Sequence, residues 1–242
     1  MKQRDLQPEK MDDPSLPEAE HLLALRGLAR LNRVSGIGPS LFRSIRGFVQ
    51  HRPDRRLRVL DVASGSGDVP IRWVRKAMRE GWKLDLTLLD NRQTACDEQQ
   101  RRASEQGVSV TSIQSDCLTQ PLPSGFDVVT SSLFFHHLSN PQVFQLLQAM
   151  QSASSGGLIL CDLERSRINL ELVRLASRCL SRSTVVHHDS LASVRAAFTM
   201  SEFSGLASSA LGRPFRIHRV FPSRFVLITK ESVVRSPIPA IA

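Results

Sequence analysis

Apolar residues recur along the chain with two different spacings, and the change falls near residue 57. The segments 21–34 and 40–50 repeat apolar residues every three or four positions, which is the spacing of one helix face. From residue 57 onwards, short aliphatic runs alternate with segments of helical spacing. This alternation predicts a parallel β-sheet with helices on both faces, preceded by a helical cap.

The individual elements follow from the same pattern. Five runs are expected to be strands: 58–62, 84–89, 108–114, 126–132 and 158–162. Helices are expected at 69–79, 91–106, 142–153, 168–180, 191–198 and from the capping box at 199–202 to residue 212, with a polar loop at 187–190. The last two apolar runs, 215–221 and 224–229, are only two residues apart. So short a link allows an antiparallel hairpin and not a parallel crossover.

We therefore expect an α/β fold with a Rossmann-like, doubly wound sheet. The sheet is mostly parallel, ends in a C-terminal antiparallel hairpin and carries an N-terminal helical cap. Residues 1–56 are predicted to form an arm and the cap, with 1–18 only loosely attached. Residues 57–230 are predicted to form the sheet domain and residues 231–242 a tail. A length of 242 residues suits one such domain and is short for two.

Composition narrows the class without naming a function. Apolar residues make up 41% and charged residues 23% of the chain, as in an ordinary globular protein. No run approaches the roughly 18–20 apolar residues of a membrane helix, and the polar N-terminus lacks the apolar segment of a secretory signal. We therefore expect no membrane span and a cytoplasmic location. The four cysteines form no C-x-x-C pair, so we expect free thiols and no metal site.

The most informative stretch is residues 59–68, where a strand runs into a glycine turn and then into a helix. Gly65 and Gly67 allow close approach of the backbone to a ligand. A dinucleotide fingerprint has a third glycine where this chain has Pro70, and the acidic Asp68 is unfavourable beside a pyrophosphate. Asp68 is instead expected to cap the helix. A ligand without phosphate fits better, and S-adenosylmethionine (SAM) is such a ligand.

Three acidic residues follow successive strands. Asp61 ends the first strand and is expected to hold the SAM ammonium directly or through water. Asp90 ends the second strand, where a carboxylate can accept from both ribose hydroxyls. Asp116 follows the third strand, where it can accept the adenine amino group while the backbone N–H of Cys117 serves a ring nitrogen. Each alone is an ordinary cap or turn residue, but together they predict a nucleoside site.

With these motifs, the sequence resembles class I SAM-dependent methyltransferases of the small-molecule type. Residues 61–67 resemble the family's D/E-x-G-x-G-x-G motif, residues 126–138 its fourth strand and loop, and residues 156–160 its fifth strand. The first motif glycine is Ala63 in this chain. We expect binding to survive if that residue is extended, and a weakened or lost cofactor site stays open if it is not. The resemblance implies a SAM site made by Asp61, Ala63, Ser64, Gly65, Gly67, Asp90, Asn91, Asp116, Cys117 and Ser131.

Histidines are the candidates for a general base, which a methyl acceptor needs if it must lose a proton. His136 and His137 follow the fourth strand, where the family's loop faces the methyl group. His187 belongs to a His-His-Asp cluster in which a carboxylate can orient an imidazole. Packed histidines in loops remain the plain alternative for all three.

The expected activity is methyl transfer to an oxygen or carbon of a small, largely apolar acceptor. An RNA methyltransferase stays open because the net charge is +9, with 27 arginines and 5 lysines. A nicotinamide-dependent (NAD(P)) oxidoreductase fits a similar sheet, and the alanine at position 63 keeps a non-catalytic SAM-binding protein open. The oligomeric state does not follow from the sequence.

Overall fold

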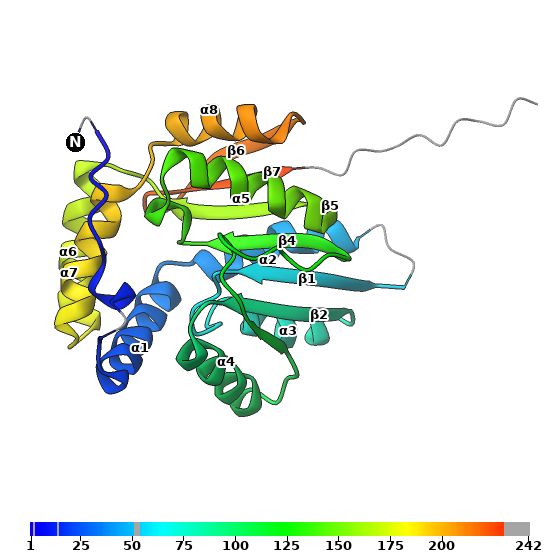
Figure 1. The fold of residues 1–242 in the computed structure, drawn as a ribbon. Helices are drawn as coiled ribbons and strands as arrows, with labels where there is room; N and C mark the ends of the chain where they lie inside the picture. Colours follow the sequence, from blue (N-terminus) through cyan, green and yellow to red (C-terminus); the bar gives the residue numbers. More distant parts are fainter. Residues whose placement is uncertain (2, 14, 51–53, 230–242) are drawn as a thin grey trace, which may run out of the picture.

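The computed structural model describes residues 1–229 except 2, 14 and 51–53. Its strands form one seven-stranded sheet in the order β3-β2-β1-β4-β5-β7-β6 (Figure 1). The strands are β1 (Arg56–Val62), β2 (Lys83–Asp90), β3 (Thr111–Gln114), β4 (Phe126–Ser132), β5 (Ser154–Leu163), β6 (Phe215–Val220) and β7 (Arg224–Thr229). The first five pair in parallel, whereas β7 runs antiparallel to both β5 and β6. The predicted sheet and its terminal hairpin are confirmed.

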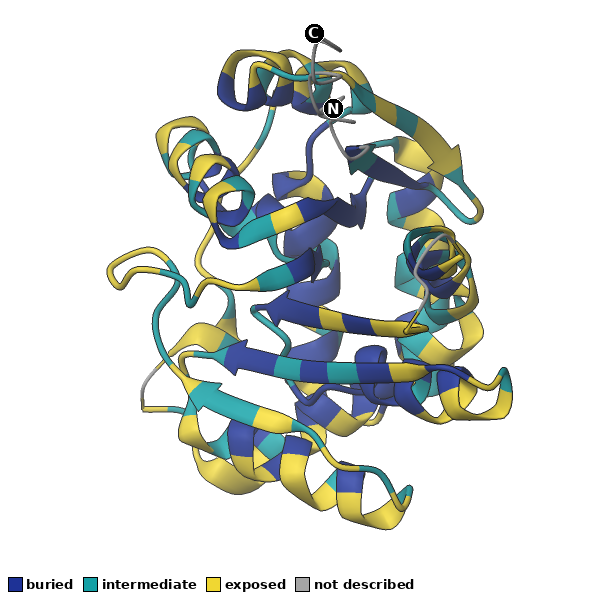
Figure 2. Cartoon of the chain, turned by 90° about the vertical axis from the view of Figure 1, so that its right-hand side faces the viewer, coloured by how far each residue is buried: buried dark blue, intermediate teal, exposed yellow. Residues whose placement is uncertain are grey.

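The helices cover both faces of this sheet. They are α1 (Glu18–Val34), α2 (Ile37–Val49), α3 (Pro70–Arg79), α4 (Gln93–Glu105), α5 (Asn140–Ala153), α6 (Arg167–Leu180), α7 (Thr184–Ala196) and α8 (Met200–Leu211), with short 3-10 turns η1 (Lys10–Asp12) and η2 (Phe135–His137). One core lies between the sheet and α2 and α3, and a second between the sheet and α5 and α8. Buried colour follows the strands through the middle of the molecule (Figure 2).

Local sequence explains where several helices begin. Thr199 and Glu202 form the predicted capping box at the start of α8, and Ser139 and Gln142 form a second one at α5. Asp68, by contrast, does not cap α3. That helix starts at Pro70, with Val69 as its N-cap and without a side-chain hydrogen bond at the cap. The expectation that Asp68 caps this helix was therefore wrong.

Two other expectations were wrong. Residues 187–190 are not a loop but the middle of α7, because Ser183 caps the helix and carries it through the polar stretch. Residues 1–18 are not loosely attached either. The arm, as we call residues 3–16 without residue 14, runs along α7 and ends beside α1 (Figure 1). Its Arg4 donates hydrogen bonds to the carbonyls of His136, Leu138 and Ala196.

The helices α1, α6 and α7 form a layer beyond the carboxyl ends of the parallel strands (Figure 1). The strand order reverses between β1 and β4, and in open sheets ligands bind at this reversal. Among the described helices, none combines the length and apolar character needed to cross a bilayer. The expected tail, 231–242, lies outside the described residues.

Candidate active site

Two cavities lie side by side at the carboxyl ends of the strands, with volumes of about 390 Å³ and about 360 Å³. They share walls from the arm, α1, the glycine turn and the loop after β4. The shared residues are Glu9, Met11, Leu25, Leu28, Ala63, Gly65, Leu133 and His137. We call the smaller one the nucleoside cavity and the larger one the acceptor cavity, for the residues that line them.

The nucleoside cavity gathers most of the residues expected to bind SAM. Asp90, Asn91, Asp116 and Cys117 line it together with Ala63 and Gly65. These residues come from the ends of β1, β2 and β3, so the parallel register brings acids far apart in sequence to one edge. Ser64 lines the neighbouring acceptor cavity.

Asp90 holds the glycine turn as well as facing the cavity. Its Oδ2 accepts the backbone N–H of Gly65 at 2.8 Å, and its Oδ1 accepts that of Arg92 at 3.1 Å. Burial raises the pKa of Asp90, and these backbone hydrogen bonds oppose the rise. Each carboxylate oxygen keeps a lone pair for a further donor such as a ribose hydroxyl.

Asp116 and Cys117 occupy the far end of the nucleoside cavity. Asp116 accepts the N–H of Leu118 at 2.9 Å and the hydroxyl of Thr119 at 3.0 Å, which fixes its carboxylate in a turn. Burial raises the pKa of the Cys117 thiol to about 12. Cys117 therefore stays a neutral thiol at physiological pH and contributes shape and backbone rather than charge.

Ala63 stands in the left-handed region, with φ of 54°, beside Gly65 at 52° and Gly67 at 64°. An extended Ala63, the condition under which the sequence predicts unimpaired binding, is therefore not met. A left-handed residue with a Cβ costs about 1–2 kcal/mol. The chain keeps the backbone of a three-glycine turn with alanine in the first position. The turn is therefore formed, and it carries local strain.

Three of the expected cofactor residues do not line either cavity. Asp61 is 1% exposed and accepts a 2.5 Å hydrogen bond from the Thr130 hydroxyl, and burial raises its pKa to about 7. Gly67 lies within the fold, where a Cβ would come within 2.8 Å of Ile71. Ser131 is fully buried, and its hydroxyl has no hydrogen-bond partner within the described residues.

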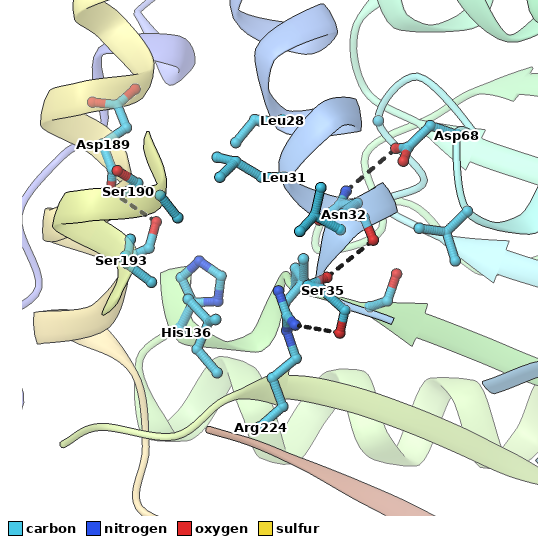
Figure 3. Close-up of a pocket in the computed structure, with 18 of the residues that line it drawn as sticks. Leu28, Leu31, Asn32, Ser35, Asp68, His136, Asp189, Ser190, Ser193 and Arg224 are labelled. Atoms are coloured by element: carbon cyan, nitrogen blue, oxygen red, sulfur yellow. Dashed lines mark hydrogen bonds between the residues drawn. The ribbon is translucent and has the colours of Figure 1, made fainter. Parts of the chain in front are cut away.

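A carboxylate that was not among the expected site residues faces the acceptor cavity. Asp68 is 7% exposed, and its Oδ2 has no partner in the described part of the chain. Its Oδ1 accepts from Asn32 Nδ2 at 3.4 Å (Figure 3). The same cavity is lined by Arg224, whose buried Nε likewise finds no partner among the described residues. Because buried charges are normally paired, this carboxylate and this cation fit a ligand carrying both an ammonium and a carboxylate.

The end of α1 connects these two charges. Ser35 donates from Oγ to the carbonyl of Asn32 at 3.0 Å, and the Ser35 carbonyl accepts from Arg224 at 3.5 Å (Figure 3). Burial lowers the pKa of Arg224 and raises that of Asp68. A zwitterionic amino-acid group, such as the methionine end of SAM, matches this pair in charge.

His136 is the best-oriented of the expected bases. Its Nδ1 lies 2.6 Å from Asp162 Oδ1, and its backbone N–H donates to Asp162 Oδ2 at 2.9 Å. Both side chains are 3% exposed, and His136 lines the acceptor cavity. Burial opposes the charged ring, but Asp162 and then Glu9 outweigh it and raise the pKa of His136. Asp162 was missed although it ends the predicted strand 158–162, the same kind of position that singled out Asp61 and Asp90.

The arm adds a second carboxylate beside this pair. Glu9 Oε1 lies 4.0 Å from His136 Nε2 and 3.9 Å from His137 Nδ1, and it accepts a hydrogen bond from the Ser193 hydroxyl. Burial raises the pKa of Glu9 to about 7. Asp189 of α7 fixes the arm here by accepting the backbone N–H groups of Lys10 and Met11, both at 2.9 Å.

The ligand atoms of Glu9, His136 and His137 lie within 4.8 Å of one another, the kind of group that can hold a metal ion. The separations of 3.9–4.0 Å from Glu9 exceed the roughly 3.4 Å between ligands of a tetrahedral zinc site. These side chains would have to draw together to bind such an ion. The expectation of no metal stays a prediction.

Of the three histidines expected as bases, the structure brings two to the cavities and leaves the third outside them. His136 and His137 face the cavities, and burial, together with the charge of His136, lowers the pKa of His137 well below its usual value. His187 is not brought to the site. It lies on α7 outside both cavities, with Nε2 2.8 Å from the carbonyl of Ser181, because helix formation through 187–190 turns it away from the strand ends.

The walls of the acceptor cavity are mainly aliphatic. They come from α1, α6 and the β6–β7 turn and include Leu28, Leu31, Leu172, Val173, Ala176, Leu180 and Phe221. Leu28 and Leu31 point toward the space beside His136 (Figure 3). The lining suits a molecule with a substantial apolar surface.

Comparison with known proteins agrees with this geometry. Residues 59–157 match the model of a family described as a methyltransferase domain, whereas a search of curated proteins found no significant match. Among solved structures, a putative O-methyltransferase from Nostoc punctiforme has a TM-score of 0.65 at 16% identity, covering 94% of this chain and 64% of its own.

Two further structures share the fold. A SAM-dependent methyltransferase from Aquifex aeolicus has a TM-score of 0.59 at 16% identity, covering 90% of this chain and 100% of its own. Human N-acetylserotonin methyltransferase, solved with SAM, has a TM-score of 0.62 at 16% identity, covering 89% of this chain and 56% of its own. This chain thus spans about three fifths of the length of two of the three. Residues 59–157 are thus similar to a methyltransferase domain, and the chain shares the Rossmann-like fold of these three proteins.

Proposed function

We propose that the protein transfers the methyl group of SAM to an oxygen or carbon of a small, largely apolar acceptor. The observation that carries this proposal is the His136–Asp162 pair on the wall of an aliphatic cavity that adjoins the nucleoside cavity. A base is needed only where the acceptor loses a proton, as a hydroxyl or an acidic carbon does.

The residues divide the cofactor between the two cavities in this proposal. Asp90 and Asp116 hold the ribose and adenine, and Asp68 and Arg224 bind the ammonium and carboxylate of the methionine end. Asp61 is buried behind the turn, where its carboxylate accepts from the Thr130 hydroxyl, and it does not contact the cofactor directly. This assignment satisfies the partnerless buried atoms of Asp68 and Arg224.

For methyl transfer, the protein has to align the acceptor with the methyl group and to accept the acceptor's proton. SAM supplies an electrophilic methyl group, whose bond to sulfur breaks as the bond to the acceptor forms. The apolar walls orient the acceptor, and orientation of this kind contributes about 7–11 kcal/mol to lowering a barrier. His136 Nε2 takes the acceptor's proton, while Asp162 holds the tautomer with Nδ1 protonated and stabilises the imidazolium.

The names of structural neighbours support the acceptor class. They include an O-methyltransferase from Planctomyces limnophilus solved with apigenin, at 16% identity and a TM-score of 0.59. The aliphatic walls of the acceptor cavity suit such a molecule better than they suit a polyanion. We therefore rank an RNA substrate below a small apolar one.

A two-step experiment tests the proposal. Calorimetry with SAM should show binding to the full chain, and NADH should show none. The chain is then incubated with SAM and a panel of phenols and other hydroxylated apolar compounds, and the products are screened for the mass of one added methyl group.

Methylation of a panel member that is insensitive to salt between about 50 and 200 mM supports the proposal. Methylation confined to added RNA, with steep salt dependence, would overturn it. Binding of SAM without transfer to the panel or to a full metabolite extract would favour a non-catalytic protein.

A further inference from the structure

Large apolar side chains stand in solvent around the mouth of the acceptor cavity. They are Val34 (69% exposed), Ile168 (72%), Leu172 (44%), Leu175 (66%) and Phe221 (89%), and we call them the apolar rim. Val34, Leu172 and Phe221 also line the cavity, so the rim and the mouth are continuous. Soluble proteins rarely gather such residues without a partner surface.

The rim is organised along α6. Ile168, Leu172, Leu175 and Cys179 follow one another at spacings of four, three and four residues, which places them in one row on the helix surface. The row faces outward, whereas Asn169 and Ser177 of the same helix are buried. The helix therefore carries an apolar row that nothing in the described chain covers.

A charged row runs beside the apolar one with the same spacing. It consists of Arg167, Glu171, Arg174 and Arg178. Arg174 pairs with Glu171 at 2.7 Å, and no ion pair in the described part of the chain neutralises Arg167 or Arg178. Arg33, next to Val34, is exposed on α1. The flank of the rim is therefore net positive.

This charge decides between possible partners. Two copies of the chain meeting rim to rim would bring their arginine rows together, and like charges at an interface oppose association. An amphipathic helix with an apolar row beside arginines fits the boundary between lipid head groups and acyl chains, where anionic lipids attract the arginines. We propose that the apolar rim docks the enzyme on an anionic lipid surface.

Docking in this way would place the cavity mouth against the bilayer. An apolar acceptor dissolved in the membrane could then enter between α6 and the β6–β7 turn without crossing water. This consequence rests on the proposed function, whereas docking itself does not, because it can be measured without SAM or an acceptor.

Vesicle sedimentation tests the proposal. The full chain is mixed with vesicles of phosphatidylcholine alone or of phosphatidylcholine with phosphatidylglycerol. We expect binding to the anionic vesicles, weakened at least tenfold in Ile168→Ser/Leu175→Ser, since two apolar side chains would no longer be buried. Arg167→Gln/Arg178→Gln should weaken it by about fivefold per arginine. Neither pair of substitutions lines a cavity.

Met78→Ser is the matched control, because Met78 is 60% exposed on α3, away from the rim. It should bind vesicles like the unaltered chain, and all variants should bind SAM equally by calorimetry. The proposal is overturned if the unaltered chain ignores anionic vesicles, if both serine substitutions leave binding unchanged, or if they dissociate a dimer instead.

Discussion

The two cavities of the candidate active site, which are its two halves, are built in different ways. The nucleoside cavity takes Asp90, Asn91, Asp116 and Cys117 from the tips of adjacent parallel strands, and the arm and α1 close it with Glu9, Asp12 and His21. The acceptor cavity takes its walls from the arm, α1, the loop after β4, α6, α7 and the hairpin turn, between residues 9 and 224. The ends of neighbouring strands therefore provide the acidic wall of the nucleoside cavity, whereas packing of segments far apart in the sequence makes most of the acceptor cavity.

The largest expected effect is a loss of turnover on substitution of His136, which tests whether the acceptor half works independently of the half that binds SAM. His136→Ala should lower turnover by about 10²–10⁴-fold, the usual contribution of a general base, and leave SAM affinity unchanged. Asp162→Asn should lower turnover in the same direction, because the ring loses its orienting carboxylate. Methylation rates with an acceptor from the panel measure turnover, and calorimetry with SAM measures the affinity.

His187→Ala is the control for that pair, since His187 bonds to a backbone carbonyl away from both cavities. Equal losses in His187→Ala and His136→Ala would show that the base has been misassigned. A loss of SAM binding in His136→Ala would show that the two halves are not separable.

The reciprocal change lies at Asp90. Asp90→Ala should weaken SAM binding roughly tenfold or more, because each charge-assisted hydrogen bond contributes about 1.5–3 kcal/mol. Asp97→Asn on α4 removes an exposed charge nearby and should leave the affinity as it is. Calorimetry measures both, and circular dichroism checks that the fold is kept. Unchanged affinity in Asp90→Ala would place the ribose elsewhere.

A smaller effect tests how the arm acts on the acceptor half. Glu9, with a pKa raised to about 7, carries part of a negative charge near neutral pH at 4.0 Å from His136 Nε2. Glu9→Gln removes this charge, so the pKa of His136 should fall. Because the base acts in its neutral form, the acid limb of the rate profile should move to lower pH. Turnover at neutral pH should change only several-fold.

Glu20→Gln, an exposed acid on α1, is the matched control for this charge change and should leave the profile in place. Histidine NMR titration of the full chain reads the same shift without an acceptor. If the pKa of His136 is unchanged in Glu9→Gln, the arm covers the cavity without influencing the base electrostatically.

The smallest effect concerns the strain in the glycine turn. Ala63→Gly should raise the free energy of unfolding by up to about 1 kcal/mol, since glycine takes the positive φ without a Cβ clash but loses more chain entropy. Ala149→Gly in α5 should instead lower it by about 1 kcal/mol. Denaturant melts compare the two. A destabilised Ala63→Gly would show that the turn is not strained.

The sequence predicts that Asp90 and Asp116 lie close together, because strand order converts spacing along the chain into proximity. Asp90 and Asp116 each end an apolar run, and parallel pairing leaves them at the same edge. The fold follows from the same alternation. The φ of Ala63 was beyond this reasoning, because a residue type limits backbone angles only weakly and the bond from Gly65 N–H to Asp90 helps to hold the turn.

The acceptor half was less predictable for a physical reason. Glu9, Asp162 and Asp68 become important only through packing. Glu9 lies in a polar segment that reads as unattached, and Asp162 ends a predicted strand without a glycine turn after it to mark a ligand site. Arg4 anchors the arm by stacking on Phe198, with its Cζ 3.4 Å from the centroid of the ring. The two residues are more than 190 positions apart, so no local sequence pattern predicts this contact.

The antiparallel direction of β7 has a consequence for how acceptor preference can change. A further parallel strand would begin at the opposite edge of the sheet, whereas β7 begins where the five parallel strands end. The turn before it, with Phe221 and Pro222, thus becomes part of the reaction chamber. Lengthening or shortening this one connection would therefore change the size of the acceptor cavity while it leaves the nucleoside cavity at the strand ends unaltered.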